Sequence, residues 1–378
     1  MPNLLNYLKA AKDLSFGDLP LNDLDRICIN ELAYIPFGEL AGWTTSDSQT
    51  LFDFLEENVE HLQVGALITE NRLRLSYLMA ISKRFENLTI SHYVSSITVE
   101  FERQFAAALF TLPDGNYHQI VFRGTDDTLI GWKEDFKLTY MREIPSHRSA
   151  IRYLKHLLPH LEGEIVISGH SKGGNLALYA STQLPKDLQD KVSRIIWLDS
   201  PGVQEYMLTR EGYLNIKDKV QGYLPQDSIV GIMLWHLESK ERVVSDAFSI
   251  GQHNIFSWQV DLKHLGTFQE VTHQGEVSRS LEKTFKEWTD ELGIHELKQI
   301  FDLVFDSFLD NGLSRFSDFT FDEKWKILAA LAQFGSLDKA KRHLLTHSAT
   351  LLLAQFTTNF VAENFKKHPA PQEHRNKQ

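Results

Sequence analysis

Ser171 is the residue of this chain whose surroundings most clearly point to chemistry, because it lies between two glycines at a spacing typical of a serine nucleophile. The segment Gly169-His170-Ser171-Lys172-Gly173 follows the apolar run 165–167 and precedes the small-residue stretch 174–180. These residue types predict a short buried strand, a sharp turn that carries the serine, and a helix. Such a turn, a nucleophile elbow, lifts the hydroxyl above the sheet edge, where the N-terminus of the helix favours an oxyanion.

A serine hydroxyl needs a base to remove its proton, and the base needs a third group that fixes its orientation. In the α/β-hydrolases, whose elbow this segment resembles, an acidic residue and then a histidine follow the serine along the chain. We expect Asp227 to be the acid, because it follows the predicted strand 220–224 after a tight turn. Asp199 is the alternative, since it ends the strand directly after the elbow unit.

The chain contains 16 histidines, so most of them must have other roles. We expect His253 to be the base, because it lies in a turn-like loop after a predicted strand and follows both candidate acids. His236 is the alternative, although its place at the end of an apolar run also fits a packed histidine. His170 precedes the serine, so we expect a structural role for it, with its side chain directed away from Ser171.

An oxyanion formed during acyl transfer needs two backbone donors. The N–H of Lys172, the residue after the nucleophile, is the expected first donor. Thr125 is the expected second donor, with Asp126 as its alternative, because Phe122-Arg123-Gly124-Thr125 ends a predicted strand with a glycine that permits close approach. The Lys172 ammonium either raises the positive potential at the site, which favours an anionic substrate, or forms an ion pair at the surface.

These segments resemble the class 3 lipase branch of the α/β-hydrolases, through the motifs 122–125 and 169–174 and through Trp132 and Asp135 between them. The segment 252–258 further resembles a bacterial family of uncharacterised, lipase-like serine hydrolases. The resemblance spans about residues 95–260. It implies a triad and two oxyanion donors, namely Ser171, Asp227 and His253 with Thr125 and Lys172.

The elements that must position these residues divide the chain into zones. We expect a helical N-terminal region at 1–95, an α/β-hydrolase core at 96–262, a C-terminal helical region at 263–366 and a disordered tail at 367–378. In the core, a hairpin of strands 97–112 and 117–122 precedes strands that alternate with helices, which predicts a mostly parallel sheet. The segment 203–219 is either a helical flap over the pocket or a crossover helix.

Composition excludes several classes of protein. The chain is 42% hydrophobic and 24% charged, as in ordinary globular proteins, and its net charge of −11 argues against nucleic acid as a partner. The one cysteine, Cys28, is expected as a buried thiol, which favours the cytoplasm. We find no signal peptide and no apolar run long enough to span a membrane. The apolar faces of the C-terminal helices are expected to pack on the core, with peripheral membrane contact as the alternative.

The sequence therefore predicts a cytoplasmic serine hydrolase that cleaves an ester, a thioester or a lipid-like acyl bond of a small molecule through an acyl-enzyme on Ser171. We expect neither a metal nor an organic cofactor. Two other functions fit the same fold: a non-catalytic scaffold or binding protein, and an acyltransferase that uses the same triad. The presence of all three candidate triad residues favours a catalytic protein.

Overall fold

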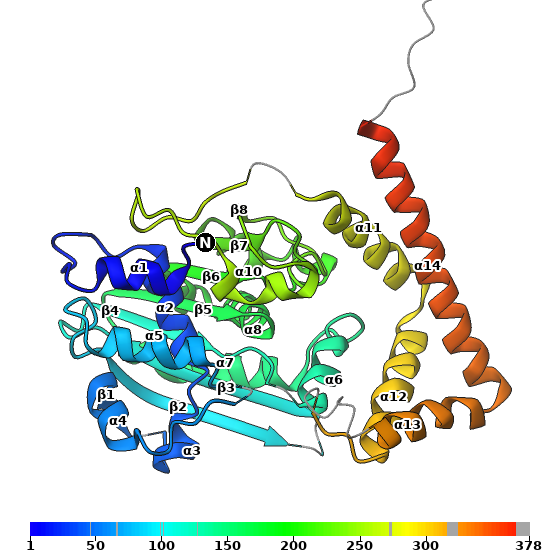
Figure 1. Cartoon of the computed structure of the whole chain (residues 1–378), viewed down its shortest axis with the longest axis horizontal. Coiled ribbons are helices and arrows are strands. Elements are labelled where there is room, and N and C mark those ends of the chain that lie inside the picture. The colour runs from blue at the N-terminus through cyan, green and yellow to red at the C-terminus, as the bar shows by residue number, and fades with distance from the viewer. Residues whose placement is uncertain are drawn as a thin grey trace, which may run out of the picture.

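The computed structural model describes residues 1–45, 47–65, 67–98, 100, 102–126, 128–271, 274–315 and 324–367. An eight-stranded sheet forms its centre, and the strands lie in the same order in the sheet as in the chain (Figure 1). These strands are β1 (Ser48–Thr50), β2 (Thr89–Thr98), β3 (Arg103–Thr111), β4 (Tyr117–Phe122), β5 (Glu164–His170), β6 (Arg194–Leu198), β7 (Val220–Pro225) and β8 (Ser239–Val243).

Strands β1 to β4 pair antiparallel, and strands β4 to β8 pair parallel. In the parallel part, Phe122 lies opposite Gly169, and His170 lies opposite Leu198. The loops that follow β4, β5 and β6 therefore leave the sheet side by side at one edge, which is where sites form in sheets of this kind. The mostly parallel sheet and its flanking helices confirm the expected α/β-hydrolase fold.

Two boundaries differ from the prediction. The expected hairpin around residues 113–116 joins β3 to β4, but residues 97–98 belong to β2, which pairs antiparallel with β3. Glu102, directly before β3, has a φ of 44°. The region 1–95 is also not helical throughout, because β1 and the first part of β2 lie in it.

The N-terminal helices cover one face of the sheet, and the most deeply buried of them is α2 (Asp23–Leu32). Asn22 caps α2 by accepting hydrogen bonds from two backbone N–H groups of its first turn. Cys28 lies on this helix and is buried, as expected. The other helices of this layer are α1 (Leu4–Ala11), α3 (Phe37–Ala41), α4 (Leu51–Asn58) and α5 (Glu70–Ala80).

The opposite face carries α7 (Pro145–Leu157) and α8 (Lys172–Thr182), with the short helices α9 (Lys186–Lys191) and α10 (Glu211–Leu214). The segment 203–219 contains α10 and two single-turn 3₁₀ helices rather than one continuous helix. A Cβ atom added to Gly212 would lie 2.0 Å from the carbonyl oxygen of Thr182, and Tyr213 is fully buried. The segment is therefore a crossover that packs tightly on α8.

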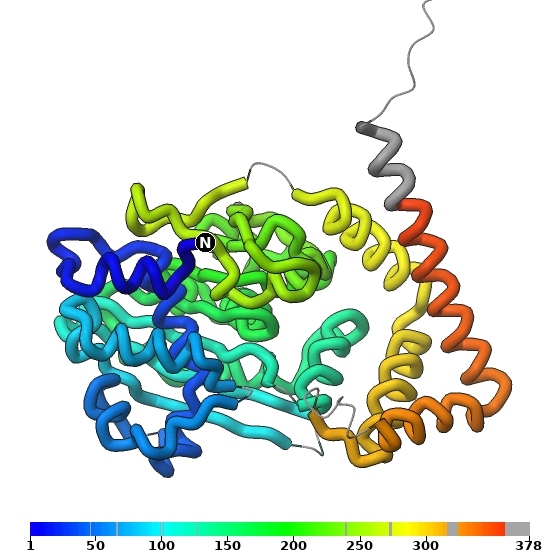
Figure 2. The backbone as a smooth tube through the Cα atoms, in the orientation of Figure 1, coloured from blue at the N-terminus to red at the C-terminus, as the bar shows by residue number. Residues whose placement is uncertain are grey.

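The remaining helices form an arch beside the core, drawn in yellow to red in Figure 2. They are α11 (Glu276–Glu291), α12 (Ile294–Asp310), α13 (Lys324–Ser336) and α14 (Lys339–Lys367). The arch joins the core through α6 (Leu129–Lys137), because Leu129 shares an apolar cluster with Trp288 and Phe301. Residues 272–273 and 316–323 of the predicted C-terminal helical region and 368–378 of the predicted tail lie outside the described residues. Among the described helices, none has the length and apolar character needed to cross a membrane.

Candidate active site

Ser171 sits on a strained turn between β5 and α8. Its backbone has a φ of 57° and a ψ of −132°, a region that residues with side chains rarely occupy. A Cβ on Gly169 would lie 2.1 Å from the carbonyl carbon of Gly173, and one on Gly173 would lie 2.0 Å from the carbonyl oxygen of Phe122. The two glycines of the sequence motif are thus required, because only hydrogen atoms fit where strand, turn and helix meet.

The imidazole of His253 is held by Asp199. The Nδ1–H group of His253 donates to Oδ2 of Asp199 over 2.7 Å. The other oxygen of Asp199 accepts from the Ser228 hydroxyl and, over 3.1 Å, from the N–H of Gly231. The Asp199 side chain is 1% exposed and that of His253 is 18% exposed. A histidine whose Nδ1 proton is fixed in this way presents a basic Nε2 atom.

Asp227, the acid expected from the sequence, lies elsewhere. Its backbone N–H donates to Oε1 of Gln252 over 3.1 Å, and its carboxylate accepts from Nε2 of the same side chain over 3.4 Å. The turn after β7 carries Asp227 against Gly275, where an added Cβ would lie 1.6 Å from its Oδ1. Asp199 instead follows β6, the neighbour of β5, and turns with a φ of 38°. The structure therefore replaces Asp227 by Asp199 as the partner of His253.

His170 connects the loop of His253 to the elbow, a role that the sequence did not suggest. Its Nε2–H donates to the backbone carbonyl of His253 over 2.9 Å, and its Nδ1 accepts from the Tyr34 hydroxyl over 3.0 Å. The rings of His170 and His253 lie 4.4 Å apart. Burial and the nearby His253 lower the pKa of His170 well below its usual value, which favours a neutral ring. The residue before Ser171 thus positions the loop of His253.

His236, the alternative base, belongs to a different cluster. Its Nδ1 lies 2.8 Å from a carboxylate oxygen of Glu238, and its ring stacks on Trp197 at 4.4 Å. The side chain of His236 is 2% exposed. Burial lowers its pKa despite the neighbouring carboxylate. These contacts give His236 the character of a packed core histidine.

The two expected oxyanion donors border the serine. Gly124 lies so close to the elbow that an added Cβ would come 3.2 Å from the Cβ of Ser171. The next residue, Thr125, therefore also lies close to the elbow. No described residue accepts a hydrogen bond from the backbone N–H of Thr125 or Lys172. The carboxylate of Asp126, the alternative, accepts from the N–H of Thr128 over 2.9 Å and so caps the following turn.

The Lys172 ammonium is fully buried beneath this site, contrary to both expectations for it. Nζ donates to Oε1 of Gln104 over 2.7 Å and to Glu134 over 3.1 Å, and it lies 3.6 Å from Asp135. Burial alone would lower the pKa of Lys172, but the two carboxylates raise it above its usual value. The charge is thus neutralised inside the protein and does not face a substrate.

An apolar cavity of about 440 Å³ is lined in part by the segments next to His253 and next to the residues that bind Asp199. Ile250 belongs to the same single-turn helix as His253, and Ile229 and Met233 flank the residues that bind Asp199. The other walls come from three helices, α6 with Trp132 and Phe136, α11 with Leu281, Thr284 and Phe285, and α14 with Leu352, Leu353 and Phe356. In the part of the chain that the structure describes, no three histidine, cysteine or acidic side chains are grouped as metal ligands would be.

Three solved lipase structures are similar to this chain at low levels. The M37 lipase has a TM-score of 0.33 and 16% identity, over 55% of this chain and 68% of that chain. The Rhizomucor miehei lipase in its native propeptide complex has a TM-score of 0.34 and 14% identity, over 58% and 69% of the two chains. The Lip2 lipase of Yarrowia lipolytica has a TM-score of 0.32 and 11% identity, over 57% and 86%.

No curated protein matches the sequence. A family model does match it: the Mbeg1-like model covers residues 79–306, which is more than half of the 378 residues. The matched segment contains the elbow, the loop of Thr125, Asp199 and His253. The chain belongs to the Mbeg1-like family.

Proposed function

We propose that this protein is a serine hydrolase that cleaves an ester or thioester of an apolar acyl group. One observation carries the proposal: His253 is oriented by the buried Asp199 at 2.7 Å, in a loop that His170 ties to the elbow of Ser171. A serine on a strained turn and a histidine with a fixed tautomer are the two parts that nucleophilic catalysis needs.

The proposed reaction uses these groups in sequence. Nε2 of His253 takes the proton of the Ser171 hydroxyl as Oγ attacks the acyl carbonyl, and the backbone N–H groups of Thr125 and Lys172 receive the oxyanion. Collapse of this intermediate breaks the bond to the alcohol or thiol, which leaves with the proton from His253. Water, activated by the same histidine, then hydrolyses the acyl-enzyme and restores Ser171.

The cavity next to the site supports an apolar acyl group as the substrate class. Its walls are almost entirely aliphatic and aromatic, and it lies beside the loops of Asp199 and His253. Burial of a hydrocarbon chain there contributes about 0.8 kcal/mol per methylene group to binding. In this proposal the C-terminal arch, through α11 and α14, forms the wall that holds the chain.

Labelling with a fluorophosphonate probe tests the proposal, because the probe reacts with activated serines. We expect rapid labelling of the native chain, none of Ser171→Ala, and labelling slowed by roughly 10²-fold or more in His253→Ala. His264→Ala is the matched control, since the side chain of His264 is 78% exposed and pairs only locally with Asp261. A folded native chain that stays unlabelled, or a Ser171→Ala chain that still reacts, would contradict the proposal.

A further inference from the structure

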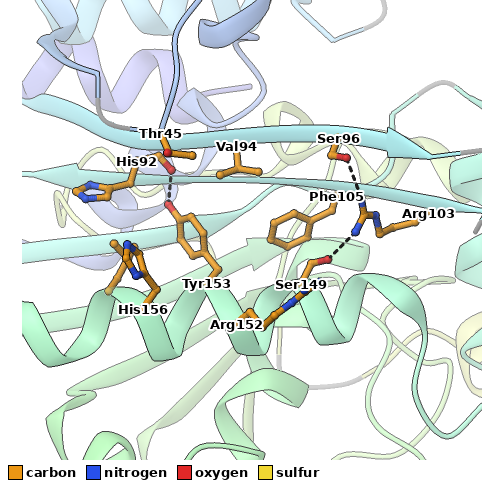
Figure 3. A pocket seen from close by; sticks show the side chains of 11 residues that line it. Thr45, His92, Val94, Ser96, Arg103, Phe105, Ser149, Arg152, Tyr153 and His156 are labelled. Atoms are coloured by element: carbon orange, nitrogen blue, oxygen red, sulfur yellow. Dashed lines mark hydrogen bonds between the residues drawn. The ribbon is translucent and has the colours of Figure 1, made fainter.

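A second cavity lies between the antiparallel part of the sheet and helix α7, on residues that the proposed reaction does not use (Figure 3). Its volume is about 580 Å³, within the range of small-molecule sites. Strand β2 contributes His92 and Ser96, and Arg103 comes from β3. Helix α7 forms the opposite wall, as Figure 3 shows. The lining residues thus come from β2, β3 and α7, together with Thr45 from the segment before β1.

Two guanidinium groups in this cavity have no carboxylate partner in the part of the chain that the structure describes. Arg103 donates only to hydroxyls, over 2.9 Å to Ser96, 3.0 Å to Thr98 and 3.3 Å to Ser149. Its Nε atom is buried without an acceptor among the described residues. Arg152 lines the same cavity, and no described carboxylate forms an ion pair with it. The cavity therefore has an uncompensated positive charge.

Several other buried arginines do pair with acids, although Arg123 is also buried without an ion pair to a described carboxylate. Arg84 pairs with Asp25 over 2.5 Å, and Arg72 pairs with Glu31 over 2.9 Å. The chain as a whole has a net charge of −11, so acidic groups are abundant. The side chains that line this cavity nevertheless include no acid.

Two histidines also line the cavity, His92 from β2 and His156 from α7. Burial and the neighbouring His156 lower the pKa of His92, which favours a neutral ring that contributes hydrogen-bonding groups rather than charge. The hydroxyls of Ser96 and Ser149 accept from Arg103, so their own O–H groups remain able to donate to a ligand.

The floor of the cavity is apolar and fixed. Val94 and Phe105 lie on it, and the Tyr153 hydroxyl donates to the backbone carbonyl of His92 over 2.7 Å. This bond holds the irregular part of β2, where the register with β3 shifts between Ser91 and Val94. A ligand that fits this cavity has an anionic group that the two arginines can bind and an apolar part that can pack on the aromatic surface of the floor.

We propose that this cavity binds the phosphate group of a small phosphomonoester. A phosphate offers two negative charges and three terminal oxygens, which suits two guanidinium forks surrounded by hydroxyls better than a carboxylate does. The ligand is either a free phosphorylated metabolite or the headgroup of phosphatidic acid, since both carry a phosphomonoester. The site does not depend on the proposed hydrolase activity.

Calorimetric titration of the full chain with phenyl phosphate tests the site. We expect binding that weakens roughly tenfold or more in each of Arg103→Gln and Arg152→Gln. Arg148→Gln is the matched control on the same helix, because its side chain is 71% exposed and pairs with Glu143. Ser171→Ala should bind as the native chain does. Arg152 is exposed on α7, so its variant should fold even if the loss of Arg103 disturbs β3.

Flotation with vesicles separates the two sources of phosphate. Binding to vesicles of phosphatidylcholine and phosphatidic acid that is lost in Arg152→Gln would assign the site to a lipid headgroup. Phenyl phosphate binding without vesicle binding would assign it to a free metabolite. The proposal is overturned if the native chain binds neither probe, or if Arg148→Gln weakens binding as much as Arg103→Gln and Arg152→Gln do.

Discussion

The Thr125 hydroxyl donates a hydrogen bond to the carboxylate of Asp135, ten residues further along the chain. The other oxygen of that carboxylate lies 3.6 Å from the Lys172 ammonium. Thr125 and Lys172 are the two proposed oxyanion donors, so side-chain contacts anchor both of their loops to one residue of α6. The backbone geometry of the site thus depends on a buried charge cluster that touches no substrate.

Asp135 should give the protein a measurable pH dependence of stability. Burial raises the pKa of Asp135 to about 6, above the value of about 3.9 expected in the unfolded chain. Because the folded state holds this proton more tightly, the contribution of Asp135 to stability is fully present below about pH 4 and is lost as the pH rises through about 6. Asp135→Asn lacks this dependence.

Urea unfolding measured from pH 4 to pH 7.5 tests this prediction. Over this range the unfolding free energy of the native protein should fall by up to about 3 kcal/mol relative to that of Asp135→Asn. Equal slopes for the two proteins would contradict the assignment.

The choice between the two acids can be decided by kinetics. Asp199→Asn should lower kcat for a reactive ester by about 10³- to 10⁴-fold, because His253 loses the acceptor that fixes its tautomer. Asp227→Asn should lower kcat by less than about tenfold, since Asp227 acts on His253 only through Gln252. The reverse ranking would restore Asp227 as the acid. Equal melting temperatures of the two variants would exclude unfolding as the cause.

The side chain of Lys172 should stabilise the folded protein, in addition to the proposed role of its backbone N–H as an oxyanion donor. Lys172→Met leaves the Glu134 carboxylate buried without its ammonium partner, which should cost about 3–5 kcal/mol of unfolding free energy. Glu134 still accepts from Ser146 and from the N–H of Gln104, so the double variant Lys172→Met/Glu134→Gln should regain part of this loss. Denaturant unfolding of the two single variants and the double variant measures the coupling. Additive losses would show that the pair is not coupled.

The apolar cavity should set the preference for acyl length. Leu281→Trp on α11 fills part of it, so kcat/KM for p-nitrophenyl esters of long acids should fall roughly tenfold or more, while acetate hydrolysis changes little. Leu328→Trp is the control, because Leu328 is 52% exposed on α13 and does not line the cavity. A uniform loss over all chain lengths would argue against the cavity as the acyl site.

The elbow could be predicted from the sequence because its requirements are local: Gly169 and Gly173 flank Ser171 at a spacing that only one kind of turn uses. The acid could not be chosen in this way. Asp199 and Asp227 both follow parallel strands, and the difference between them lies in the direction that each turn gives the carboxylate.

Contacts between distant segments explain the other omissions. Lys172 is neutralised by Glu134 and Asp135 of α6 and donates to Gln104 of β3, and all three residues lie 37 or more positions away in the chain. His170 reaches the loop of His253, which lies 83 residues further on. The positive cavity combines β2, β3 and α7. Local sequence patterns do not encode these long-range contacts, because the burial of each charge depends on the complete fold.

The backbone of Ser171 carries a consequence for the balance between stability and reactivity. A glycine would adopt its φ of 57° at little cost, whereas a residue with a side chain loses about 1–3 kcal/mol there. Ser171→Gly should therefore strengthen the fold while it removes the proposed nucleophile. In a protein that used this sheet only as a scaffold, Ser171→Gly would raise the stability of the fold without any loss of function. Ser171 is therefore a position at which reactivity and stability favour different residues.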